Sequence, residues 1–124
     1  MRRVAPVALL AGVCACTTPA TSSAEASIAS ELVQWGMARC IALSAQGTEY
    51  EQDAKASVGA LTELGEAQPD SYGRIDAFLK ERLANPLVSK SGASLTTLSC
   101  VRLASDPAFL ALVQEEAGPV TSED

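Results

Sequence analysis

The sequence predicts an all-α fold, a compact bundle of about five helices with one inter-helix disulfide. Apolar residues recur at helical spacing in successive segments, and no segment alternates apolar and polar residues as a half-buried strand does. The 124 residues are 48% hydrophobic but only 4% aromatic, so the chain can enclose one modest core built mainly from Ala, Leu and Val. A second domain does not fit.

The chain begins with the features of a secretory signal. Arg2 and Arg3 form a basic start, and an apolar run of roughly ten residues follows over 4–13. This run is too short to cross a bilayer as a permanent helix. We therefore expect a signal peptide over 1–16 and a mature protein in the periplasm, either soluble or lipid-anchored.

Two kinds of cleavage site fit the signal. The residues before Cys16 loosely resemble a lipobox, in which Cys16 would carry the lipid and tether the protein to a membrane. Small residues at Ala20 and Ala24 suit an ordinary signal peptidase instead, which extends the cleavage site to residue 24. The sequence leaves both open.

Export decides how the cysteines are interpreted. Cys14 and Cys16 belong to the signal or its cleavage site, so Cys40 and Cys100 remain in the folded part. In an oxidising compartment two such thiols usually pair. Closing a loop of about sixty residues would stabilise the domain by roughly 3 to 4.5 kcal/mol. The less favoured alternative is two buried, reduced thiols that act as small hydrophobes.

A flexible leader over 17–27, rich in Thr, Ser, Ala and Pro, is expected before a helical domain over 28–117 and a disordered tail over 118–124. The expected helices run over 28–46, 51–66, about 69–85, 95–104 and 107–117.

Several residues mark where these helices begin and end. Gly47 is expected to end the first helix, Ser94 to cap the fourth, and Asp106 with Pro107 to begin the last. Trp35, the only tryptophan, is expected to anchor the core.

Charge and composition exclude several classes of function. The chain has no His, which removes any Ser-His or Cys-His nucleophile pair, so we expect no enzyme. Without Arg2 and Arg3, seven basic residues face 15 acidic ones, a net charge of −8 that argues against nucleic acid and anionic membranes. The same charge favours a basic protein partner.

The acidic residues form no recognisable site. Clustered carboxylates can perform acid and base chemistry, but here they fall on loop starts and solvent faces and lack the spacing of a calcium loop. We therefore expect no catalytic residue, no metal and no cofactor. The carboxylates concerned are Glu49, Glu51, Asp53, Asp70 and Asp76.

One irregular segment, residues 86–92, stands between the third and fourth expected helices. It begins with two apolar residues that are expected to be exposed. On composition alone it is equally a simple connector or a loop that contacts a partner. Its candidate binding residues are Leu87, Val88, Ser89, Lys90, Ser91 and Gly92.

Four blocks in residues 30–115 resemble the immunity proteins that neutralise peptidoglycan amidase effectors of type VI secretion. They are Trp35–Cys40 with Ile41-Ala42; Asp53–Ser57 with Ala60-Leu61; Tyr72 with Ile75-Asp76; and Ser89–Gly92 leading through Leu98–Leu103 to Ser105 and Phe109-Leu110. The chain departs from the family pattern at Ala104, where an aromatic residue is usual, and at Pro107, where the motif is more often acidic.

The resemblance implies an all-helical periplasmic inhibitor that pairs its two cysteines, forms a homodimer and inserts a loop into the active-site groove of a papain-like cysteine amidase. The expected partner is therefore a cognate amidase that cleaves the peptide stems of the cell wall, and the expected loop is 86–92. The alternative is a structural or assembly lipoprotein of the cell envelope that inhibits nothing.

Overall fold

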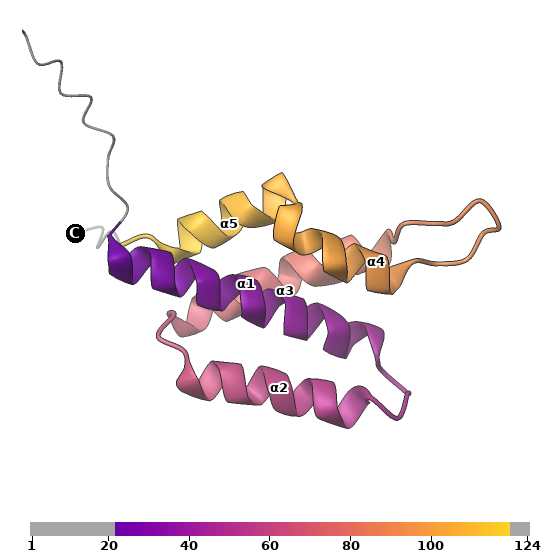
Figure 1. The fold of residues 1–124 in the computed structure, drawn as a ribbon, viewed down its shortest axis with the longest axis horizontal. Helices are drawn as coiled ribbons and strands as arrows, with labels where there is room; N and C mark the ends of the chain where they lie inside the picture. Colours follow the sequence, from indigo (N-terminus) through magenta and orange to yellow (C-terminus); the bar gives the residue numbers. More distant parts are fainter. Residues whose placement is uncertain (1–21, 120–124) are drawn as a thin grey trace, which may run out of the picture.

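The computed structural model describes residues 22–119, and these residues form a helical bundle (Figure 1). Apart from a single antiparallel bridge they contain no β-structure, which confirms the all-α prediction. The elements in chain order are α1 (Ser23–Ser44), α2 (Glu51–Leu64), α3 (Pro69–Ala84), α4 (Thr96–Val101), the 3-10 helix η1 (Arg102–Ser105) and α5 (Pro107–Ala117).

The first helix begins five residues earlier than the expected start at Ile28. The Ser22 hydroxyl accepts a hydrogen bond from the Glu25 backbone N–H at 3.2 Å, and the Glu25 carboxylate accepts one from the Ser22 N–H. This reciprocal capping box fixes the helix start, so the last part of the expected leader is helical. The signal peptide over 1–16, with Cys14 and Cys16, and residues 17–21 lie outside the described residues.

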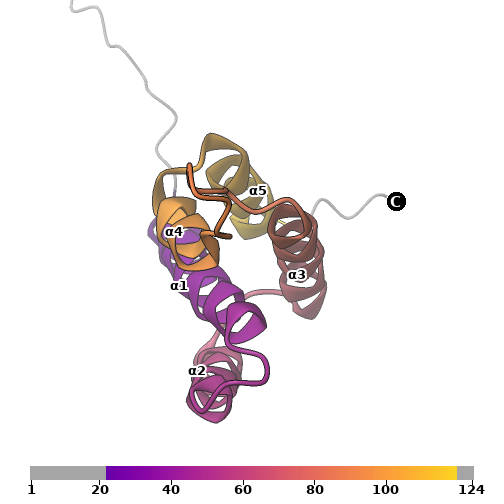
Figure 2. The same cartoon turned by 90° about the vertical axis from the view of Figure 1, so that its right-hand side faces the viewer.

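Helix α1 lies at the centre of the bundle. It packs against α2 on one side and against α3, α4 and α5 on the others, and Figure 2 shows it between α2 and α5. Because most sides of α1 meet another helix, its apolar residues are spread around its circumference. The largest fully buried side chains are Leu32, Cys40, Ile75, Leu79, Leu103, Phe109 and Val113, and Trp35 is buried beside them, as expected.

Gly36 sets how closely α1 and α5 approach each other. A Cβ atom on Gly36 would lie 2.5 Å from the Phe109 ring and 3.5 Å from Ile75. The Phe109 side chain is fully buried and therefore occupies the space that any side chain at position 36 would need. The missing side chain of Gly36 is thus part of the core packing.

The fourth helix differs from its expected start. Leu95 rather than Ser94 is its N-terminal cap residue, and no side chain caps it, because Ser94 pairs with Val88 in the antiparallel bridge. The start of α5 is as predicted: the Asp106 carboxylate accepts hydrogen bonds from the backbone N–H groups of Ala108 and Phe109.

The first helix ends at Ser44, two residues before the expected end. Gly47 nevertheless adopts the left-handed conformation, with φ of +78°, in the turn that leads to α2. Ile41 is 50% exposed, whereas Cys40 beside it is buried.

No single helix within residues 22–119 is long and apolar enough to cross a membrane. The consecutive segments 96–105 and 107–117 meet that criterion only when taken together, and they are bent by 58° where they join.

Candidate functional site

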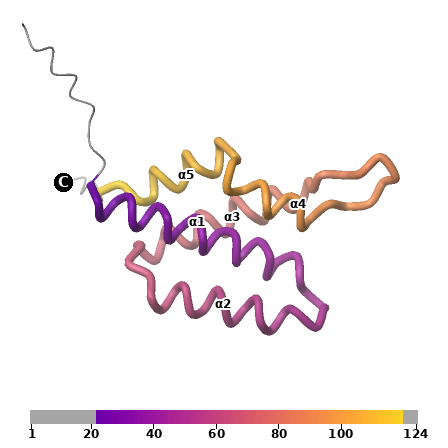
Figure 3. The backbone as a smooth tube through the Cα atoms, viewed as in Figure 1, coloured from indigo at the N-terminus to yellow at the C-terminus, as the bar shows by residue number. Residues whose placement is uncertain are grey.

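The expected loop 86–92 belongs to a short β-hairpin that projects from one end of the bundle. The Leu95 N–H donates to the Leu87 carbonyl at 2.7 Å, and the Ser89 N–H donates to the Ala93 carbonyl at 2.9 Å. These two bonds flank the Val88–Ser94 bridge. Figure 3 shows the two arms running out beyond α4 before the chain turns back. We call residues 86–95 the hairpin.

Ser89 and Gly92 build the tip of the hairpin. The Gly92 N–H donates to the Ser89 carbonyl at 2.9 Å, which closes a four-residue turn, and Gly92 has φ of +87°, where a glycine is favoured. The Ser89 hydroxyl accepts from the Ala93 N–H at 3.0 Å and lies 2.8 Å from the Ser91 hydroxyl. These local bonds give the tip a defined shape without a hydrophobic core.

All six candidate binding residues lie together in this hairpin. Val88 is 60% exposed and Leu87 39% exposed, and Lys90 at the tip is exposed as well. Ser89 is half-buried because its hydroxyl is used within the turn. The hairpin therefore presents apolar surface and one cation on a hydrogen-bonded frame.

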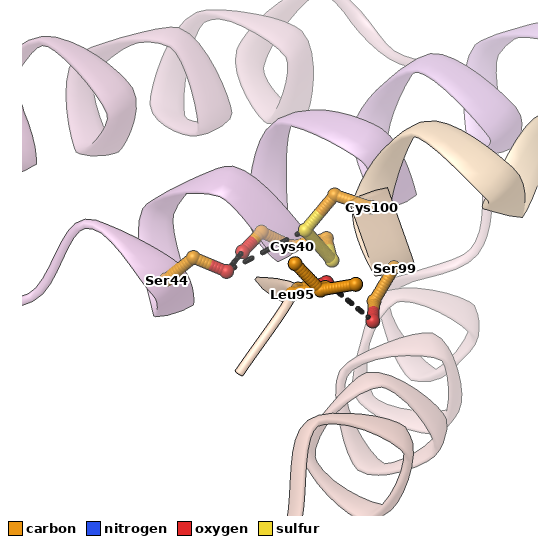
Figure 4. Close-up of a disulfide and its surroundings, with 5 residues drawn as sticks. All are labelled: Cys40, Ser44, Leu95, Ser99 and Cys100. Carbon is orange, nitrogen blue, oxygen red and sulfur yellow. Dashed lines mark hydrogen bonds between the residues drawn. A yellow bond between two sulfur atoms is a disulfide. The ribbon is translucent and has the colours of Figure 1, made fainter. Parts of the chain in front are cut away.

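The predicted disulfide joins the helix that follows the hairpin to the centre of the bundle. Cys40 on α1 is bonded to Cys100 on α4, their Cα atoms are 5.5 Å apart, and each residue is 2% exposed. Figure 4 shows the pair with Ser44, whose hydroxyl donates to the Cys40 carbonyl at 2.9 Å and lies 3.5 Å from the Cys100 sulfur. Both cysteines are thus part of the core.

Helix α4 needs such an attachment. It has only six residues and no side-chain cap, and its buried residues are Ser99 and Cys100. A helix of this length is not stable by itself in water. The disulfide, together with the buried Leu103 in η1, therefore fixes the position of α4 and with it the root of the hairpin.

Two of the acidic side chains predicted to form surface, Glu51 and Asp76, are engaged in ion pairs. Arg39 and Lys80 both contact the Asp76 carboxylate, at 2.6 and 2.7 Å. Although partial burial works in the opposite direction, these two cations lower the pKa of Asp76 below its ordinary value. Glu51 pairs with Lys55, and the hydrogen bonds from Lys55 and from the Gly47 N–H lower the pKa of Glu51.

Residues 22–119 contain no cluster of side chains that could bind a metal ion. No group of three or more His, Cys, Asp or Glu side chains in this range is arranged to hold an ion.

A second polar cluster connects α1 to the link between α2 and α3. The Glu31 carboxylate accepts hydrogen bonds from the Tyr72 hydroxyl at 2.6 Å and from the Glu66 N–H at 2.8 Å. Burial, and then the bond to Glu31, raises the pKa of Tyr72 to about 12. Trp35 packs 5.0 Å from the Tyr72 ring and donates to the Thr62 hydroxyl. These contacts connect helices of the bundle to one another and lie away from the hairpin.

Arg82 and Arg102 also belong to the hairpin end of the molecule, although no sequence motif marks either of them. The available signal is charge, because residues 85–105 contain Lys90 and Arg102 but no Asp or Glu, in a chain that is acidic as a whole. Arg82 lies at the end of α3 and pairs with Asp106 at 2.7 Å.

Comparison with known protein families gives a match over most of the chain. The family model described as Tai4, type VI secretion system amidase immunity protein, matches residues 30–113, which is more than half of the chain. No curated protein and no solved structure matches the chain. The matched range includes both bonded cysteines and the whole hairpin. The chain therefore belongs to the Tai4 family of type VI secretion amidase immunity proteins.

Proposed function

We propose that this chain inhibits a peptidoglycan amidase by inserting its hairpin into the active-site groove of that enzyme. The observation that supports the proposal is the hairpin itself, which projects from the bundle and exposes Leu87, Val88 and Lys90. A projecting, partly apolar hairpin has the shape to enter a concave groove, where apolar and cationic groups can act as binding anchors.

The hydrogen bonds within the hairpin lower the entropy that would be lost on binding. Association is weakened when a loop must be ordered on contact, and it is strengthened when the loop already holds its bound shape. Here the Ser89 turn and the bridge between Val88 and Ser94 order the hairpin, and the Cys40–Cys100 disulfide holds the helix at its root. The inhibitor can therefore block the groove by steric occlusion, with no chemistry of its own.

The acidic surface of α2 and α3 supports a second, weaker part of the interaction. Glu63 of α2, Glu66 in the link between the two helices and Asp70 of α3 are exposed, and the mature chain has a net charge of −8. Such a field attracts a basic protein and accelerates its encounter. The end of α2 and the start of α3 lie at the end of the bundle opposite the hairpin (Figure 1), so we propose that these carboxylates attract basic groups on the amidase at long range and do not contact the groove that holds the hairpin.

We place this inhibitor in the periplasm, where a wall-cleaving amidase would act. The expected signal over 1–16 supports export. Helix α1 begins at the end of the bundle opposite the hairpin (Figure 1). A lipid on Cys16 would therefore be attached to the part of the chain that leads into α1, at the end of the bundle away from the hairpin.

We also propose that two copies of the chain associate. Ile41 and Val101 directly follow the two bonded cysteines in sequence, and they are 50% and 59% exposed. Exposed apolar residues of this kind are candidates for a homodimer interface. Sedimentation of the mature protein at micromolar concentration should give a dimer, and Ile41→Glu with Val101→Glu should give a monomer; a wild-type monomer would exclude the dimer.

The experiment that tests inhibition uses the purified cognate amidase and peptidoglycan fragments. Wild-type protein should suppress cleavage at a stoichiometric ratio. The double variant Leu87→Ala with Lys90→Ala should lose most of this inhibition, because it removes an apolar and a cationic contact from the hairpin while leaving the disulfide and core intact.

The matched control is Leu64→Ala with Lys55→Ala, which removes the same two residue types from α2, outside the hairpin. Leu64 is 84% exposed, so this control should keep both the fold and the inhibition. Equal inhibition by wild type and the hairpin variant would exclude the role of the hairpin. If the wild-type protein neither binds nor inhibits the amidase, the role as a structural envelope protein takes its place.

A further inference from the structure

The cationic side chains of this protein are unevenly neutralised. Five of the seven basic residues in the described range 22–119 form an ion pair with a carboxylate there, namely Arg39, Lys55, Arg74, Lys80 and Arg82. Lys90 and Arg102 have no carboxylate within ion-pair distance in the same range. Both belong to the segment 85–105, which contains no acidic residue. The free positive charge of the domain is therefore concentrated at the hairpin end.

A cleft of about 390 Å³ lies at the root of the hairpin, beside Arg102. Leu87 at the start of the hairpin lines it on one side, Ser99 of α4 and Ser105 of η1 line it on another, and Arg82 and Asp106 complete its wall. Because the hairpin contributes to its lining, a partner that grips the hairpin also covers this cleft.

The cleft contains more free hydrogen-bond donors than free acceptors. Asp106 is the only carboxylate that lines it, and both of its oxygens are occupied: Oδ1 accepts from the α5 backbone, and Oδ2 accepts from Arg82. Arg82 is held in place by this bond and by its position 5.0 Å above the Phe78 ring. The Arg102 guanidinium keeps its donors available.

These observations fit an anionic group with a planar fork geometry. A guanidinium with free N–H groups binds a carboxylate by two parallel hydrogen bonds. A nucleic acid or another polyanion would be repelled by the net charge of −8 on the mature chain, whereas a single carboxylate on a protein surface would not.

We propose that the cleft receives an Asp or Glu side chain from the surface of the bound amidase and that Arg102 is its anchor. This inference rests on the proposed function, because it assigns a second contact to the same partner. The hairpin would enter the groove, and the carboxylate beside that groove would enter the cleft. Arg102 then contributes to partner specificity, because an amidase without that carboxylate would leave a guanidinium buried and unpaired.

The test measures the dissociation constant for the purified cognate amidase with wild type, Arg102→Gln and Lys55→Gln. Lys55→Gln removes the same charge from α2 and serves as the matched control. We expect Arg102→Gln to weaken binding by about tenfold or more and Lys55→Gln by less than about twofold. The difference between the two dissociation constants should become smaller at high salt, because salt screens the charge of Arg102 on the free protein, where its side chain is exposed. Equal dissociation constants for both variants at low salt would overturn the proposal.

A charge reversal identifies the residue on the partner. Arg102→Glu should abolish most of the binding, and replacing one acidic residue beside the amidase groove by Lys should restore it. Failure of every acidic position near the groove to restore binding would overturn the proposal. Thermal melts of the variants control for folding, and they should match wild type because Arg102 is exposed. An amidase that does not bind wild type at all would instead refute the proposed function.

Discussion

Cys40 of α1 and Cys100 of α4 are sixty positions apart in the chain, and their disulfide fixes a six-residue helix to the centre of the core. The link orders the segment that follows the hairpin, which has few other buried contacts. The position of the hairpin and the stability of the bundle therefore depend on the same bond.

Replacing both cysteines by Ala should lower the free energy of unfolding by roughly 3 to 4.5 kcal/mol, because the unfolded chain regains the freedom of a long loop. Urea denaturation measures the change. Hydrogen exchange should show that α4 and the hairpin lose more protection than α2 does. Dithiothreitol should lower the free energy of unfolding of the wild type and leave that of the double variant unchanged. If reduction does not change the stability of the wild type, the disulfide does not have the structural role described.

Gly36 and Gly59 should respond in opposite directions to the same substitution. Both lie inside helices, where Ala is preferred over Gly by up to about 1 kcal/mol. Gly59 has open space around it, so Gly59→Ala should stabilise the protein by that amount. Gly36→Ala would push against Phe109 and should destabilise it by about 1 to 2 kcal/mol after the helix gain is subtracted.

Thermal melts of the two glycine variants check this contrast. The wild-type midpoint should lie between those of the variants. A rise in midpoint for Gly36→Ala would show that the Phe109 ring moves without cost and that α1 and α5 do not require this close approach.

The fold class and the Cys40–Cys100 disulfide could be predicted from the sequence, whereas the orientation of α1 in the bundle could not. Periodic apolar residues, with two cysteines in a chain that begins with an expected export signal, are enough to predict a disulfide-linked bundle. Helices pack against α1 on several sides, and its buried residues, such as Leu32, Trp35 and Cys40, do not form one narrow stripe, so the sequence pattern does not predict how α1 is oriented. The start of α1 was missed because the capping box of Ser22 and Glu25 lies in a stretch of low-complexity composition.

The candidate site was predictable as a segment but not as a structure. Leu87 and Lys90 stood out because they break the helical pattern. The antiparallel bridge could not be foreseen, since one pair of residues gives no alternation to detect, and it removes Ser94 from the helix cap. The unpaired state of Arg102 depends on which carboxylates lie nearby in space, and no sequence spacing encodes that.

Asp76 should make stability depend on pH in the acid range. Arg39 and Lys80 lower the pKa of Asp76 in the folded protein, so the unfolded chain takes up the proton first as the pH falls. The stabilisation is complete well above the ordinary value of 3.8 and is lost as the pH drops through the lower folded pKa. Asp76→Asn should cost roughly 1 to 2 kcal/mol at pH 7.

Urea titrations of wild type and Asp76→Asn from pH 7 to pH 2 measure the dependence on Asp76. The difference between the two proteins should vanish at the acid end, because both side chains are then neutral. Asp53→Asn, on the exposed side of α2, serves as the control and should run parallel to wild type. A difference that stays constant down to pH 2 would rule out the charge of Asp76 as the cause.

Gly92 and Gly47 both adopt a backbone conformation that would be strained for any residue with a side chain. Both have positive φ, +87° and +78°, and neither has atoms near the place of a new Cβ. Ala at either position should cost about 1 to 2 kcal/mol through backbone strain alone. Gly92→Ala should also weaken inhibition of the amidase, because it distorts the hairpin tip, whereas Gly47→Ala should not. Equal inhibition by the two variants would show that the shape of the tip is unimportant.

The most direct test of steric occlusion is the rate at which iodoacetamide alkylates the nucleophilic cysteine that we expect in the amidase. Cys40 and Cys100 are bonded to each other, so protein produced without residues 1–21 does not compete for the reagent. Wild-type protein in slight excess should slow the alkylation strongly, and the Leu87→Ala, Lys90→Ala variant should slow it far less. An alkylation rate that wild-type protein leaves unchanged, while it still binds the amidase, would contradict the account, because the groove would then be open in the complex.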